Sequence, residues 1–233
     1  MYDSVRFVET LSGFARTLVS PYEVEDVLAG LTENATAVFG LVGCGVSLLQ
    51  DGRLNFANGV HPAAVALEEA QHEYGRGPCL EATHTGEVVA ITDLSEYAEQ
   101  WPEYVAIATR HGVHSVAGIP LSLATETIGA LNLYSAQPRD WSPDDLRAAR
   151  ALADMATAYL VNASKLAQQS QLNQQLQQAL EKRLVIEQAK GITAQAHHAS
   201  VEAAFGLIRR HARNHNISIQ TVAEAIVNAG LRV

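Results

Sequence analysis

Cysteine is scarce in this chain: only Cys44 and Cys79 occur among 233 residues, and they lie 35 positions apart. This count excludes a disulfide-stapled secreted domain and leaves no CxxC pair for zinc or an iron–sulfur cluster. Long hydrophobic runs are also missing. The most apolar segment, 37–49, has 13 residues with three glycines, whereas a membrane span needs about 20 residues. The first residues carry neither the basic cluster nor the apolar stretch of a signal peptide. We therefore expect a cytoplasmic protein without a membrane partner.

Signatures of catalysis are absent as well. The sequence contains no GxSxG nucleophile elbow, no P-loop and no HExxH pair. The histidines at 72, 84, 111 and 114 do not follow the spacing of metal ligands. We therefore expect no enzymatic activity, no catalytic residue and no metal site, and the sequence identifies no cofactor.

Charge is unevenly distributed along the chain. Residues 1–160 contain 8 Arg, no Lys and 21 acidic residues, a net charge of −13, whereas residues 161–233 contain 8 Lys or Arg and 4 acidic residues, a net charge of +4. This asymmetry indicates an acidic globular module joined to a basic module that meets an anionic partner. The alternative is a basic tail that only balances the charge.

The N-terminal pattern predicts a sheet with helices packed against it. Apolar residues recur at three- and four-residue intervals over 23–39, which is the period of a helix with one buried face. Two strand pairs follow, at about 44–58 around Asp51-Gly52 and at 116–134 around Thr125. Between them we expect a largely irregular segment, roughly 60–112, with short elements at 79–85, at 88–92 and after Pro102. This order indicates the α+β class with an antiparallel sheet.

From Ser142 onward the pattern is purely helical, and Ser before Pro143 with acids in the first turn is a typical helix start. A heptad through this segment predicts a seam for a parallel coiled coil, in which one buried Asn selects the register. The seam positions are Ala148, Leu152, Met155, Tyr159, Asn162, Leu166, Gln169, Asn173, Leu176 and Leu180. The homodimer contacts are expected at Leu166, Asn173, Leu176 and Leu180. A polar connecting helix with no partner is the alternative.

Two shorter helices follow the long one. Ser200 and Ser218 are typical N-cap residues, and Gly230 is a typical helix end. The expected inner faces carry Val201, Phe205, Ile208 and Ala212 on the first helix and Ile219, Val222, Ala223, Ile226 and Val227 on the second. With Val185, Ala189, Ile192 and Ala196 of the long helix, they predict a compact three-helix unit of about 50 residues.

Basic side chains gather on this unit. On the long helix the sequence repeats Arg183, Lys190 and His197 every seven residues, nearly in line, and Arg209 and Arg213 border the apolar stripe of the next helix. Such clusters neutralise phosphates, and their guanidinium groups can read unpaired bases. Gly191 is unexpected because glycine inside a helix costs about 1 kcal/mol relative to alanine. We interpret it as a point of close approach by a neighbouring helix or a nucleic-acid strand.

This C-terminal unit resembles the ANTAR domain over about residues 172–229. The similarity is carried by 183–192 (RLVIEQAKGI), 202–205 (EAAF), 208–209, 212–213, Asn216 and 222–223. The resemblance implies a three-helix RNA-binding module that works as a dimer, binds paired stem-loops in nascent messenger RNA and prevents a terminator from forming. We assign RNA contacts to Arg183, Lys190, Gly191, Thr193, Arg209 and Arg213. Thr193 departs from the family, which usually has a larger apolar residue there.

Residues 1–160 resemble a GAF domain, a sensor of small molecules. The similarity is carried by 74–79 (YGRGPC), 85–89 (TGEVV), 93–94, 115–121 (SVAGIPL) and 128–135 (IGALNLYS). The resemblance implies a six-stranded antiparallel sheet with helices on its faces and a pocket between the sheet and the helical segment. Candidates for lining this pocket, around an unidentified effector, are Cys79, Tyr97, Trp101 and Tyr104. The three aromatic residues alternatively close the core.

Cys79 itself has two interpretations. It follows Gly77-Pro78 at an expected helix start, where the helix dipole lowers a thiol pKa and favours reactivity. Alternatively, it is a small buried hydrophobe.

Together the patterns predict a GAF-like sensor at 1–160, a coiled-coil linker helix at 161–180 and an ANTAR RNA-binding domain at 172–233. The function implied is transcription antitermination under the control of a sensed signal. A GAF-regulated DNA-binding transcription factor is the alternative, because the two short capped helices fit a helix-turn-helix. An enzyme that reduces free methionine sulfoxide is a third class, but that chemistry uses three cysteines and this chain has two.

Overall fold

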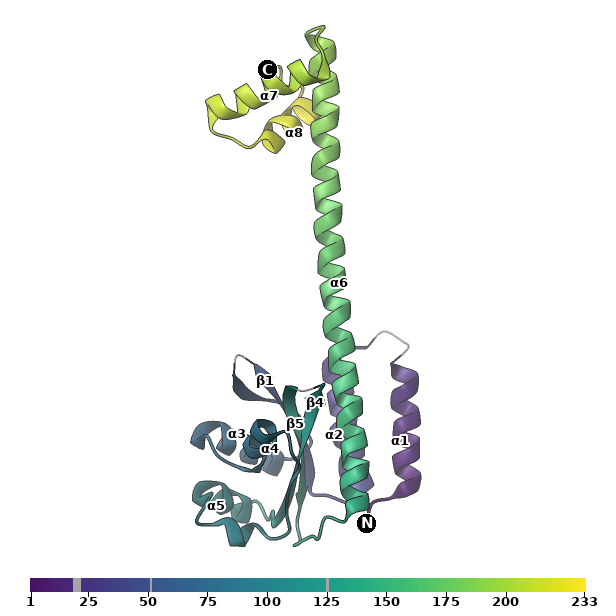
Figure 1. Cartoon of the computed structure of the whole chain (residues 1–233), viewed down its shortest axis with the longest axis vertical. Helices are drawn as coiled ribbons and strands as arrows, with labels where there is room; N and C mark the ends of the chain where they lie inside the picture. The colour runs from purple at the N-terminus through teal and green to yellow at the C-terminus, as the bar shows by residue number, and fades with distance from the viewer. Residues whose placement is uncertain (19–21, 51, 125) are drawn as a thin grey trace. The chain divides into compact units, whose positions relative to one another are not determined.

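The computed structural model describes residues 1–18, 22–50, 52–124 and 126–233, which form two compact units, Met1–Ser164 and Lys165–Val233 (Figure 1). Within these described residues, none of the helices combines the length and apolar character that a membrane crossing requires.

The N-terminal unit is built on one antiparallel sheet. Its described residues form five strands in the spatial order β2-β1-β5-β4-β3. Their bounds are β1 Gly43–Gln50, β2 Arg53–Gly59, β3 Val89–Ile91, β4 Ser115–Leu123 and β5 Glu126–Ser135. The α+β class is confirmed, but the expectation of six strands is wrong for the described part of the chain. The two long hairpins supply four strands, and only the short β3 adds to them.

Both expected hairpins are present. β1 pairs with β2 and β4 pairs with β5, each antiparallel. Gly52 in the first turn has φ +75°, a conformation that favours glycine. The two turn residues singled out in the sequence, Asp51 and Thr125, lie outside the described residues. Pairing of β1 with β5 then joins the hairpins into one sheet.

Helices cover both faces of this sheet. In Figure 1, α2 (Val24–Phe39) and the first part of α6 (Pro143–Ala196) lie on one side, and α3, α4 and α5 lie on the other. The first layer contributes Leu31, Ala35 and Leu152 to a core with the sheet residues Val46 and Leu133. The second layer buries its own apolar residues against the opposite face, including Leu67, Trp101, Tyr104, Val116 and Tyr134.

Two α-helices and one short 3-10 helix were not predicted, and two of these three elements lie in the segment that was expected to be irregular. That segment begins with α3 (Pro62–Tyr74), which starts at His61 as N-cap and Pro62 in the first turn. It continues with α4 (Pro78–Thr85), η1 (Leu94–Tyr97) and α5 (Pro102–Arg110). The other unpredicted helix is α1 (Ser4–Thr17), capped by the Asp3 carboxylate. The short helix near Cys79, the strand near 89 and the helix after Trp101 are confirmed.

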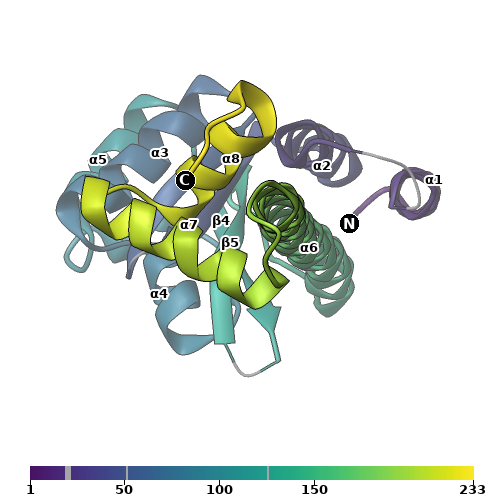
Figure 2. The ribbon, with the colours of Figure 1, turned by 90° about the horizontal axis from the view of Figure 1, so that it is seen from above.

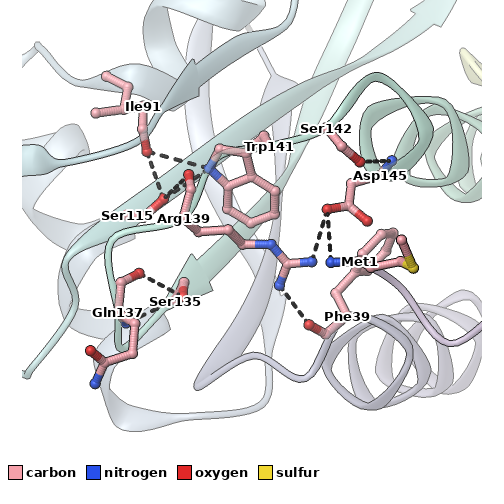
Figure 3. Close-up of polar contacts among 10 residues, drawn as sticks. All are labelled: Met1, Phe39, Ile91, Ser115, Ser135, Gln137, Arg139, Trp141, Ser142 and Asp145. Carbon is pink, nitrogen blue, oxygen red and sulfur yellow. Dashed lines mark hydrogen bonds and ion pairs between the residues drawn. The ribbon is translucent and has the colours of Figure 1, made fainter.

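The start of α6 is fixed by a buried polar cluster, drawn in Figure 3. The Ser142 hydroxyl accepts the backbone N–H of Asp145 at 3.1 Å. The Trp141 indole N–H donates to the Ser115 hydroxyl at 2.9 Å, and the Arg139 guanidinium donates to the Phe39 carbonyl at 2.6 Å. These bonds attach the beginning of α6 to α2 and to the sheet.

The long helix has two different environments along its length. Ala148, Leu152 and Tyr159 are buried in the core of the N-terminal unit, and Met155 packs against that core. The first half of the predicted seam therefore faces the core of the N-terminal unit and not a partner helix, which corrects the heptad there. From Ser164 to Leu184 every residue is exposed, so only this second segment is available for pairing.

The C-terminal unit is the expected three-helix arrangement. α7 (Val201–His215) and α8 (Ile219–Ala229) begin at Ser200 and Ser218, whose hydroxyls accept backbone N–H groups, and Gly230 ends α8. The two helices lie side by side in both views (Figures 1 and 2). Their core, shared with the end of α6, comprises Ala189, Ile208, Ala212, Val222, Ala223 and Ile226. Val201 (42% exposed), Ile192 (45%) and the exposed Ala196 lie outside this core, contrary to expectation.

Candidate functional site

Cationic side chains are exposed on the C-terminal unit. Arg183, Arg209 and Arg213 are exposed, and the Lys190 side chain retains 17% of its accessible surface. The unit carries 8 Lys or Arg and 4 acidic residues. Its surface is therefore suited to a polyanion.

Two of these cations converge on one aromatic ring. The Arg209 guanidinium lies 4.3 Å from the centroid of Phe205, and the Lys190 ammonium lies 5.2 Å from it. Both carboxylate oxygens of Glu187 accept hydrogen bonds from Lys190 at 2.9 Å. Because a ring face attracts cations, Phe205 holds two positive groups near each other across α6 and α7. From the sequence, Phe205 is expected only on the inner face of its helix. A helical period does not show which cations lie over the ring of an aromatic residue.

Gly191 is exposed to solvent, whereas Thr193 is buried. A Cβ atom placed on Gly191 would meet no described atom within 4 Å beyond its chain neighbours and its own helical backbone. No neighbouring helix of this chain therefore explains the glycine, and the surface beside Lys190 is open to an approaching strand. Thr193 is only 4% exposed and lines a cavity of about 140 Å³ with the C-terminal residues. Its side chain lies outside the exposed cationic surface.

The predicted dimer seam is unpartnered in the single chain. Leu166, Leu176 and Leu180 are 53%, 59% and 71% exposed, and Asn173 is exposed too. Two more leucines of the same helix, Leu172 and Leu184, are exposed to 56% and 59%. A row of exposed leucines along one helix is typical of a surface that packs against another helix.

A buried carboxyl group lies beneath the second helical layer of the N-terminal unit. Glu68 on α3 is 3% exposed. The hydroxyls of Tyr134 and Ser47 donate hydrogen bonds to it at 2.7 and 2.8 Å, and the Asn132 amide donates as well. Burial raises the pKa of Glu68 above its ordinary value of 4.5, and these hydrogen bonds lower it by less. The site favours the neutral acid.

Cys79 joins the same polar cluster. The Asn132 amide donates to its sulfur at 2.9 Å, and its backbone N–H donates to the side-chain carbonyl of Gln71 at 2.7 Å. The residue is fully buried. Burial, and secondly the nearby Glu68 carboxyl, raise the pKa of the Cys79 thiol well above its ordinary value. The interpretation of Cys79 as a reactive thiol with a lowered pKa is therefore wrong, because its surroundings raise that pKa.

The aromatic pocket candidates lie in the adjoining core. Trp101 and Tyr104 are buried, and the half-buried Tyr97 stacks on Trp101 with 5.1 Å between ring centroids. Cys79 and two of the three aromatics are thus closed off from solvent. No local pattern identifies Glu68 or Asn132 as members of a polar cluster, because their partners come from strands and helices far apart in the chain. Within the described residues, no cluster of three His, Cys, Asp or Glu side chains is suited to a metal ion.

Comparisons with known proteins support this division of the chain. The model of the GAF domain matches residues 23–160, and the model of the ANTAR domain matches residues 174–227. None of the curated protein sequences matches the chain.

Solved structures resemble the N-terminal unit. The GAF domain of an Acinetobacter phosphoenolpyruvate-protein phosphotransferase is 16% identical, with a TM-score of 0.54 over 68% of this chain and 94% of that one. The free methionine-R-sulfoxide reductase of Neisseria meningitidis, in complex with its substrate, is 18% identical, with a TM-score of 0.55 over 69% of this chain and 91% of that one. Identities this low show the fold alone.

The two family matches agree with the structure. The GAF match covers the unit with the five-stranded sheet, and the ANTAR match covers the three-helix unit. This chain belongs to the GAF domain family, and an ANTAR domain follows its GAF domain.

Proposed function

We propose that the protein is a cytoplasmic antitermination regulator, which binds paired stem-loops in nascent messenger RNA through its ANTAR domain under the control of a small molecule sensed by its GAF domain. The observation that carries this proposal is the cationic group Lys190 and Arg209 around Phe205, beside the open backbone of Gly191. Cations supply affinity for phosphates, and the missing Cβ lets a strand approach the helix closely.

The acting species in this proposal is a homodimer. The segment 164–184 of α6 has no buried residue, whereas most of the stability of helices in proteins comes from the packing of an apolar face. Pairing with a second copy along Leu166, Asn173, Leu176 and Leu180 would bury the exposed leucines and would place two ANTAR domains on one assembly. Each domain then binds one stem-loop of the pair.

The GAF domain is the proposed control element. An effector that binds between the sheet and α3 to α5 must displace buried side chains such as Trp101 and Tyr104. Because α6 begins in the core of this domain, a changed packing alters how two long helices pair. In such coupling the effector binds more tightly to one arrangement of the paired long helices than to another. The difference in binding free energy is typically about 1–3 kcal/mol.

Binding of the full-length protein to three nucleic acids of equal length tests the proposal. The probes are an RNA with two stem-loops, the same RNA with complementary strand annealed, and duplex DNA. We expect preferential binding to the stem-loop RNA. Preference for duplex DNA would instead support a DNA-binding regulator, and equal weak binding to all three would contradict specific RNA recognition.

Lys190→Ala identifies the surface that binds. Loss of one phosphate contact should weaken stem-loop binding and reduce the slope of log Kd against log salt by about 1. Lys165→Ala is the matched control, since it removes the same charge from the same helix about 37 Å away at 1.5 Å per residue. Circular dichroism tests whether both variants retain their helicity, as we expect. Equal affinity of the two variants would remove Lys190 from the RNA-binding surface.

A further inference from the structure

A pocket on the ANTAR domain includes Arg209, one of the two cations that contact the Phe205 ring. It has a volume of about 360 Å³ and is lined by Arg209, Ala212, Arg213, Asn216, Ile217 and Ile219. The pocket is formed where α7 ends and α8 begins. Its volume falls within the range of about 300–1,000 Å³ that is typical of small-molecule sites, so it has room for one planar heterocycle.

The lining combines apolar side chains with positive charge. Ala212 is buried and Ile219 is half-buried, and Ile217 remains 43% exposed. Two walls are the exposed arginines 209 and 213, and the lining contains no acidic residue. Within the described residues, neither guanidinium has a carboxylate within 4 Å. Both charges are therefore available to an anionic ligand.

Arg209 is held in place by Phe205. Its guanidinium carbon lies 4.3 Å from the ring centroid, so the aromatic side chain restricts the orientation of the guanidinium before any ligand arrives. A guanidinium plane fixed in this way offers a stacking surface to a nucleobase. A lysine at this position would supply the charge without the plane.

Asn216 adds a hydrogen-bonding group at the rim. Its backbone adopts the left-handed conformation, φ +52°, and its N–H satisfies the end of α7 by donating to Arg213. Among the described residues its side-chain amide has no hydrogen-bond partner, so both its donor and its acceptor can meet the edge of a base.

We infer that this pocket binds one unpaired loop base of the RNA, stacked on Arg209 and Ile217, with Arg213 near its flanking phosphate. The inference rests on the proposed RNA-binding function and deepens it. In this arrangement Lys190 and Arg183 contact phosphates of the stem, and the pocket contacts a base of the loop. The two cations attract an anionic ligand, and the absence of an acidic lining residue disfavours a basic peptide. A guanidinium beside apolar side chains can also stack on a base, which favours a nucleotide over an acidic side chain.

An abasic scan of the loop tests this inference. One stem-loop is synthesised with an abasic site at each loop position in turn, and a blunt duplex with the same stem serves as the loopless probe. Base stacking is worth about 1–3 kcal/mol, which corresponds to about a 5- to 150-fold loss of affinity at one loop position. Uniform affinity across the scan would overturn the inference.

The matched variants Arg209→Lys and Arg210→Lys assign the effect to the pocket. Both keep the charge, but Arg210 is exposed and does not line the pocket. We expect Arg209→Lys to weaken binding of the intact loop by the same factor as the critical abasic site, and to cause no further loss on that abasic RNA. Arg210→Lys should bind like the wild type. Melting temperatures of both variants show whether they fold.

The outcomes separate this inference from the proposed function. If the stem-loop binds tightly but Arg209→Lys has no effect on any probe, RNA binding stands and the base pocket is wrong. If Arg209→Lys is tolerated while Arg209→Ala weakens all RNAs alike, Arg209 contacts a phosphate and the inference is also wrong. If no RNA binds, both proposals fail together.

Discussion

The guanidinium of Arg139 donates a hydrogen bond to the buried carboxylate of Asp145 at 3.1 Å, and so ties the segment after β5 to the first turn of α6 (Figure 3). The Asp145 side chain is 1% exposed, and that of Arg139 is 14% exposed. Burial alone would raise the pKa of Asp145, but the hydrogen bond and charge of Arg139, together with the Met1 ammonium group 3.5 Å away, outweigh it and hold the pKa below its ordinary value. The pair stabilises the junction from which α6 begins.

Asp145→Asn should destabilise the GAF domain by about 3–5 kcal/mol, because it leaves the largely buried Arg139 guanidinium without its counter-charge. Asp144→Asn is the control one residue earlier. Asp144 pairs with Arg147 on the surface, where both side chains are about 70% exposed, so its loss should cost less than about 1 kcal/mol. Urea unfolding followed by tryptophan fluorescence measures both. Similar losses for the two variants would contradict a stabilising buried pair.

Acid should reduce the difference in unfolding free energy between wild type and Asp145→Asn. The pKa of Asp145 is lower in the folded state than its ordinary value of 3.8. Its stabilising contribution is therefore fully present above about pH 5 and is lost as pH falls through the folded-state value. Unfolding free energies at pH 6 and pH 3 check this. A difference that stays constant across this range would exclude the carboxylate as its source.

The two acids at the start of α6, Asp144 and Asp145, show which features a local sequence pattern predicts and which it does not. The helix start was predicted from Ser142, Pro143 and the acidic first turn, and both acids matched the helix dipole equally well. The distinct role of Asp145 depends on Arg139, which the chain places beside it only when β5 joins the sheet. Local patterns therefore predicted the hairpins and caps, while Glu68 required contacts between α3, β1 and β5 that no local pattern contains.

The same limit applies to the candidate RNA-binding surface. The periodic spacing of Arg183 and Lys190 placed them on one helix face. It did not show that Phe205 attracts Arg209, which depends on how α6 and α7 cross. It also did not show that Thr193 packs inward, which depends on α8 and the residues that follow it.

Gly191→Ala should separate stability from RNA binding. A Cβ here meets open space in the described chain, so alanine should stabilise the helix by about 1 kcal/mol. If a strand lies against this backbone, the added methyl group should weaken RNA binding by about 10-fold, or about 1.4 kcal/mol. Gly206→Ala is the matched control, because its Cβ also meets open space on α7. We expect both variants to melt at higher temperature and only the first to lose affinity. Retained affinity of Gly191→Ala would show that the RNA does not approach there.

Glu187→Gln should strengthen RNA binding. Both oxygens of Glu187 accept hydrogen bonds from Lys190, so the carboxylate competes with a phosphate for this ammonium group. Its neutralisation should raise affinity at low salt and steepen the salt dependence by up to about 1 in slope. Glu181→Gln removes an equal charge six residues earlier, about 120° around the helix, and should change binding less. Filter binding at several salt concentrations compares them, and a decrease in affinity for Glu187→Gln would mean that Glu187 positions Lys190 productively.

Glu68→Gln should remove a pH dependence of stability. Burial raises the pKa of Glu68 above 4.5 in the folded state, so folding retains a proton that the unfolded chain releases. Wild-type stability should therefore fall by up to about 1.4 kcal/mol per pH unit as pH rises from about 4.5 to the folded-state pKa. The amide cannot titrate, and its profile should be flatter. Glu69→Gln, an exposed neighbour, should keep the wild-type slope. Parallel profiles for wild type and Glu68→Gln would show that Glu68 does not titrate in this range.

Leu176→Asp tests whether the exposed segment of α6 is the dimer contact. Leu176 is 59% exposed in the single chain, so its replacement costs little within one subunit. In a coiled coil it occupies a core position, where two facing carboxylates cannot be buried without their counter-ions. We expect a shift from dimer to monomer in analytical ultracentrifugation and a loss of affinity for RNA with two stem-loops, while affinity for a single stem-loop changes little. Gln178→Asp adds the same charge two residues later on the outer face and should stay dimeric. A Leu176→Asp protein that remains dimeric would place the contact elsewhere. A monomer that still prefers two stem-loops would show that pairing of the long helices is not what brings the two RNA sites together.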